Sequence, residues 1–129
     1  MPEPFTSTVA LDADRSSGYA RWLVRNACGS WPAAQVDAAQ LLITELVANA
    51  LEHGTGEVGL RIQASTELLR VEVSDASPAP PRVADPPPSL ADERGRGLLV
   101  VAALASSWGS QAEPVSGGKA VWFELRRSR

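Results

Sequence analysis

The fold of this chain is decided by the stretch ELVANALEHG, which runs from Glu45 to Gly54. At about 100° per residue, apolar side chains in and just before this stretch fall on one stripe: Ile43, Leu46, Val47 and Ala50. The pattern predicts the last turns of a long helix that packs one face on a core. The closing glycine suits the left-handed position that ends many helices.

Polar residues follow the margin of that stripe. Glu45, Asn49 and His53 stand at positions i, i+4 and i+8, so each is offset from the last by only about 40° around the helix. This spacing predicts a polar line at the rim of the core. A carboxylate, a carboxamide and an imidazole placed there could orient a water or hydroxyl and hold a hard metal ion through oxygen. For this stretch alone, a solvated helix edge is an equal alternative.

Composition indicates a single globular domain over residues 1–129, since the chain is large enough for one core and too small for two. The formal charge is −3 and the arginines are scattered, which argues against direct binding of nucleic acid. No apolar run approaches the length of a membrane span, and no signal segment opens the chain, so we expect a cytoplasmic protein. Cys28 is the one cysteine, which excludes an internal disulfide and predicts a small buried side chain.

Periodicity predicts the order of the elements along the chain. Alternating and helical patterns give a strand at 5–11, helices at about 14–28 and 32–52, strands at 56–65 and 67–75, a helix from 98, and strands at 108–115 and 119–125. This order predicts an α/β (α+β) two-layer sandwich, in which about three helices cover one face of a mixed, mostly antiparallel sheet.

Parity along the strand at 67–75 gives a direction to its last residue. Asp75 is in step with Leu69, Val71 and Val73, so it should face the core at the strand's end. A carboxylate in that position needs hydrogen-bond donors, because an unpaired buried charge is costly. The donors could come from a ligand or from a structural partner such as a helix N-terminus or a nearby arginine.

A proline-rich segment separates Asp75 from a glycine turn. Residues 76–93 hold six of the ten prolines and few large apolar side chains, which excludes regular helix or a central strand. The segment is either a surface insertion or a lid, and its position favours a lid at about 76–94. The turn Arg94-Gly95-Arg96-Gly97 then opens a helix at Leu98, where backbone N–H groups and the helix dipole could receive a phosphate.

Taken together, the chain resembles the GHKL ATPase superfamily, which has the Bergerat nucleotide-binding fold. Within it, the chain looks most similar to the anti-sigma-factor serine/threonine kinases and their single-domain relatives. The resemblance covers about Phe5 to Leu125, and four stretches carry it in the expected order: Glu45 to Gly54, Val71 to Asp75, Arg94 to Leu98, and Gly117 to Phe123.

The resemblance implies ATP or ADP with Mg²⁺ as ligands and gives roles to particular residues. Glu45 would be the general base, Asn49 the Mg²⁺ ligand, and Asp75 the acceptor for the amino group of adenine. The other nucleotide-binding positions it implies are His53, Ser77, Arg94, Gly95, Arg96, Gly97 and Leu98.

Two departures from the family pattern stand out. Where histidine kinases have Asp-x-Gly-x-Gly, this chain has Asp75-Ala76-Ser77-Pro78, a change that the small anti-sigma-type members tolerate. Where the family often has a threonine after the last glycine box, this chain has Lys119 and Ala120 after Gly118. A hydroxyl contact to the adenine site is therefore expected to be missing, which predicts weaker affinity for ATP.

Two functions follow from this resemblance. The first is a serine/threonine protein kinase that phosphorylates an anti-anti-sigma (STAS-type) antagonist and otherwise sequesters a sigma factor. The second is a non-catalytic regulatory module that holds a partner, with ATP or ADP as a structural ligand. Glu45 and Asn49 favour the kinase, and the family's dimers suggest a homodimer.

Overall fold

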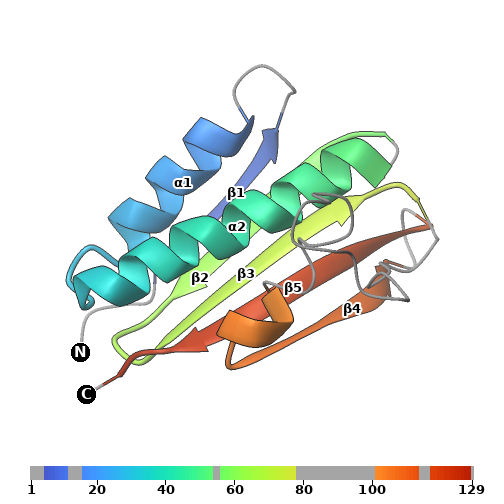
Figure 1. Cartoon of the computed structure of the whole chain (residues 1–129). Helices are drawn as coiled ribbons and strands as arrows, with labels where there is room; N and C mark the ends of the chain where they lie inside the picture. The colour runs from blue at the N-terminus through green and yellow to red at the C-terminus, as the bar shows by residue number, and fades with distance from the viewer. Residues whose placement is uncertain (1–4, 12–15, 54–55, 78–100, 114–116, 129) are drawn as a thin grey trace, which may run out of the picture.

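A computed structural model describes residues 5–11, 16–53, 56–77, 101–113 and 117–128 of the chain. Five strands form one sheet in the order β1-β2-β3-β5-β4 (Figure 1). Their bounds are β1 Phe5–Leu11, β2 Val58–Ala64, β3 Leu68–Asp75, β4 Ser107–Glu113 and β5 Gly118–Arg126. All five predicted strands are confirmed, with ends that differ from the predicted ones by a few residues at most.

The sheet is antiparallel throughout, because each of its four strand pairs is antiparallel. The expectation of a mixed sheet is therefore wrong in this detail. β3 and β4 run in the same direction and follow one another along the described part of the chain. In the sheet, however, β5 lies between them and pairs with both. The rest of the predicted fold, a two-layer α+β sandwich, is confirmed.

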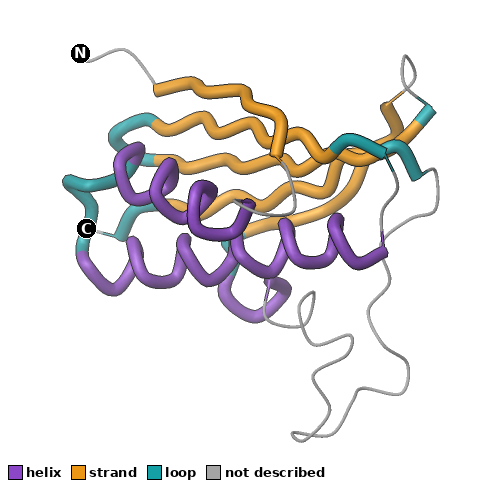
Figure 2. The backbone as a smooth tube through the Cα atoms, turned by 90° about the horizontal axis from the view of Figure 1, so that it is seen from above, coloured by secondary structure: helices purple, strands orange, loops and turns teal. Residues whose placement is uncertain are grey.

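The helices cover one face of this sheet (Figures 1 and 2). α1 (Ser16–Ala27) and α2 (Ala33–His53) pack side by side, and residues 101–104 add a helical turn. The carbonyl of Pro32 accepts hydrogen bonds from the N–H groups of Gln35 and Val36, so this proline stands at the start of α2, where its missing N–H is not needed.

The core lies between α2 and the sheet. The predicted apolar stripe of α2 is buried, with Ile43 and Val47 fully inaccessible to solvent. β3 alternates strictly between half-buried and buried positions along its length, as parity predicted. Phe123 of β5 is the largest fully buried side chain and faces the same layer. Cys28 is also part of this core, where burial raises the pKa of its thiol from 9.0 to about 11.

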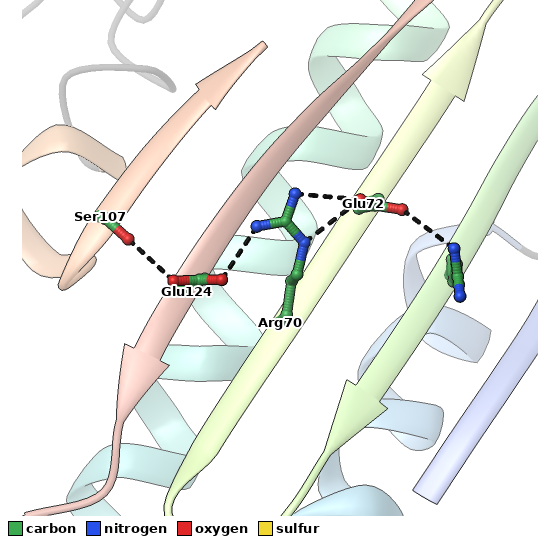
Figure 3. A network of polar contacts seen from close by, with 5 residues as sticks. Arg70, Glu72, Ser107 and Glu124 are labelled. Carbon is green, nitrogen blue, oxygen red and sulfur yellow. Dashed lines mark hydrogen bonds and ion pairs between the residues drawn. The ribbon is translucent and has the colours of Figure 1, made fainter. Parts of the chain in front are cut away.

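Charged side chains bridge the strands on the other face of the sheet (Figure 3). Arg70 donates hydrogen bonds to Glu72 and to Glu124, at 3.0 and 2.9 Å for its two terminal nitrogens, and lies 4.3 Å from the ring centre of Trp122. Burial lowers the pKa of Arg70, but the hydrogen bonds to Glu124 and Glu72 outweigh this effect and raise the pKa above its ordinary value. This face is thus held by side-chain pairs across β3 and β5.

Candidate functional site

The polar margin of α2 lies where the sequence placed it. Glu45 and Asn49 are half-buried, whereas Leu46 and Ala50, their neighbours on the apolar side, are buried. The two polar side chains are one helical turn apart on the same side of the helix. His53 is the last residue of α2, and its side chain lies outside the described part of the structure. The rim position of Glu45 and Asn49 is therefore confirmed.

Three segments converge at one end of the molecule. The C-terminal end of α2, the end of β3 and the start of β5 lie together there (Figure 1). Two glycines, Gly56 and Gly118, allow the chain to pass close to Ala76, which follows β3. A Cβ on Gly56, which has a φ of 73°, would lie 2.8 Å from the Cβ of Ala76. A Cβ on Gly118 would lie 2.8 Å from the Cα of Ala76, so side chains at these positions would push the segments apart.

A buried ion pair joins β3 and β5 at this end. Asp75 and Lys119 are directly opposite in the strand register. Nζ of Lys119 lies 3.1 Å from Oδ1 and 3.0 Å from Oδ2 of Asp75, and the two side chains are 8% and 2% exposed. The N–H of Ser77 donates a third hydrogen bond to Oδ1, at 2.7 Å. The carboxylate thus receives three hydrogen bonds from the chain itself.

The core-facing direction of Asp75 is confirmed, but its partner differs from the expected ones. The expected structural partners were a helix N-terminus or a nearby arginine, and Lys119 was expected only to remove a hydroxyl contact. A signal for the pair was present in β5. Lys119 is in step with the buried residues Val121 and Phe123, so parity places a charge on the core face that requires a carboxylate nearby.

Several predicted site residues lie outside the part of the chain that the structure describes. The glycine turn and its neighbours lie outside the described residues, as does most of the predicted lid at about 76–94. These positions are Arg94, Gly95, Arg96, Gly97 and Leu98. Ser77, by contrast, is buried and joined to Asp75 by its backbone N–H.

The oxygen atoms of the α2 margin fit a Mg²⁺–nucleotide complex. Mg²⁺ is usually held by one or two protein oxygens together with phosphates and water, and the carboxamide of Asn49 can supply such an oxygen. In the described ranges, no group of three His, Cys, Asp or Glu side chains gathers around a common point. Mg²⁺ bound at Asn49 would take further ligands from phosphate and water.

The surface carries two further features. Tyr19 and Trp22 of α1 are 42% and 49% exposed, and their rings stack with centres 6.1 Å apart. A hollow of about 350 Å³ is lined by Pro32, Thr66, Glu67, Arg127 and Ser128. Thr66 and Glu67 form the turn between β2 and β3, so the hollow lies at the opposite end of β3 from Asp75.

Among the described residues, none of the helices combines the length and the apolar character that a membrane span requires.

Comparison with known proteins gives a family match over most of the chain. The family model described as "Histidine kinase-like ATPase domain" matches residues 9–125, which span the whole described site. A search of curated proteins finds no match.

Proposed function

Because the chain belongs to the histidine kinase-like ATPase domain family, we propose that it is an ATP-binding serine/threonine protein kinase that regulates a partner protein. Membership implies binding of ATP or ADP, as the resemblance to GHKL ATPases predicted. We propose further that the activity requires Mg²⁺ and that Glu45, Asn49 and Asp75 have the roles that the resemblance implies.

The observation that carries the kinase proposal is the pair on α2. Glu45 and Asn49 are both half-buried and one turn apart, so a base and a metal ligand would address the same end of a triphosphate. Mg²⁺-ATP would supply the phosphoryl group when bound. The carboxylate of Glu45 would accept the proton of the incoming serine or threonine hydroxyl, and Asn49 would hold the metal. In reactions of this kind the protein contributes mainly position and charge.

The resemblance to anti-sigma kinases supports a particular partner. The substrate would be an anti-anti-sigma protein of the STAS type, and the same chain would sequester a sigma factor. A second function, a regulatory module without catalysis, is favoured by a specific observation. The stacked Tyr19 and Trp22 expose aromatic surface of the kind that is enriched at protein interfaces.

Transfer of radiolabelled phosphate to a candidate antagonist distinguishes these functions. Glu45→Gln should slow transfer by about 10²–10⁴-fold, the usual contribution of a positioned acid–base group, with nearly unchanged nucleotide affinity. Asn49→Ala should lose both metal-dependent affinity and turnover. Asp37→Asn is a matched control, since it removes an exposed carboxylate from the same helix and should change neither.

Two outcomes would contradict different parts of this proposal. Equal transfer rates for wild type and Glu45→Gln would show that Glu45 is not the base. A wild-type protein that binds Mg²⁺-ADP and its partner, but labels no antagonist, would leave the regulatory module as the function.

A further inference from the structure

The carboxylate of Asp75 is satisfied without any ligand. It accepts two hydrogen bonds from the ammonium of Lys119 and one from the backbone of Ser77. An adenine base, if bound there, would add a donor to a group that already has its charge balanced. This arrangement differs from that of a lone buried carboxylate, which would depend on the ligand for its partner.

That difference governs how strongly a site can discriminate between bases. A site built to hydrogen-bond one ligand group rejects an analogue that lacks the group, because buried polar atoms are then left unpaired. A carboxylate with no internal partner would therefore reject a purine whose 6-amino donor is replaced by a 6-oxo acceptor. With Lys119 in place, loss of the amino donor leaves no unpaired charge at Asp75.

Lys119 also supplies a hydrogen-bond donor, which a 6-oxo base requires in place of the acceptor that a 6-amino base uses. An ammonium has three donors, and Asp75 takes two of them. Of the two side chains, that of Lys119 is the more exposed, at 8% against 2%. The pair can donate to a 6-oxo oxygen through Lys119 or accept from a 6-amino group through Asp75.

We propose that this is a general purine-nucleotide site, in which Lys119 determines specificity by removing the preference for a 6-amino over a 6-oxo base. The inference rests on the proposed binding of nucleotide at the Asp75 end of the sheet. It extends the ligand class from adenine nucleotides to 6-oxopurine nucleotides. Inosine diphosphate is the simplest probe, because its base differs from that of ADP only in the 6-oxo group and in the N1–H that accompanies it.

Calorimetric titration of Mg²⁺-ADP and Mg²⁺-IDP into the full chain tests this proposal. For wild type, the two Kd values should agree within about tenfold, since neither base leaves a buried group unpaired. Lys119→Met keeps the length of the side chain but removes its charge, and it should raise the preference for ADP by about tenfold or more. Arg126→Met is the matched control, because it removes one exposed positive charge from the far end of β5 and should leave the ratio unchanged.

Each outcome has a defined consequence. A wild-type preference for ADP above about tenfold would overturn the inference while leaving nucleotide binding intact. The same conclusion follows if Lys119→Met is folded by circular dichroism and keeps the wild-type ratio. If Lys119→Met does not fold, the wild-type ratio alone decides. Failure of both nucleotides to bind would instead overturn the proposed function itself.

Discussion

At the scale of single residues, Asp75 and Lys119 depend on each other. Both side chains are almost completely removed from water, so each loses its hydration and regains part of that energy only through its partner. Replacing such a pair by neutral groups of similar volume is often tolerated, whereas removing one partner leaves an uncompensated charge. The pair therefore contributes to stability as a unit, whatever its role toward a ligand.

Stability measurements on single and double variants follow from this dependence. Lys119→Met should lower the free energy of unfolding by about 3–5 kcal/mol, because it leaves the Asp75 carboxylate buried without its cation. The double variant Asp75→Asn with Lys119→Met should lose less, since the asparagine oxygen can still accept the Ser77 N–H. Urea unfolding checks both values. A double variant less stable than Lys119→Met would contradict the account.

At the scale of elements, the approach of β5 to the end of β3 depends on Gly118. A Cβ at this position would lie 2.9 Å from the backbone carbonyl carbon of Asp75, which is closer than real side chains come. The obstacle is backbone, so no flexible side chain can move aside. Any side chain at 118 must therefore displace the strand ends that carry Asp75 and Lys119.

For this reason, two glycine-to-alanine substitutions should change the stability of the protein in opposite directions. Gly118→Ala should destabilise the protein by about 1–3 kcal/mol, the usual cost of overpacking. Gly18 lies in α1, and no described atom beyond its chain neighbours and the helix's own backbone comes within 4 Å of an added methyl. Gly18→Ala should therefore stabilise the protein by about 0.5 kcal/mol through helix propensity. Thermal unfolding of both variants provides the measurement. Equal effects of the two substitutions would show that the close approach at Gly118 is unimportant.

The elements also show what could be predicted from sequence. The buried stripe of α2, the rim position of Asn49 and the inward direction of Asp75 depend on local periodicity, so each was predictable. The pairing of Asp75 with Lys119 depends on the register between β3 and β5. This register brings together two residues that are 44 positions apart in the chain. Local patterns do not determine such a register, and the partner of Asp75 was missed.

At the scale of the whole molecule, the two ends of the sheet carry different features. At one end, the C-terminal end of α2 lies beside the end of β3 and the start of β5, and these two strands carry the Asp75–Lys119 pair there. At the other, the hollow beside the β2–β3 turn is lined by Thr66 and Arg127. Family membership implies a nucleotide, and the residue roles proposed above require that it bind at the first end.

Titration of ¹⁵N-labelled protein with Mg²⁺-ADP, followed by the amide resonances, tests this requirement most directly. The account predicts saturable shifts at Asn49, Ser77 and Lys119, with little change at Thr66 and Arg127. Shifts confined to Thr66 and Arg127 would place the nucleotide at the wrong end of the sheet, and no shift at millimolar nucleotide would contradict nucleotide binding altogether.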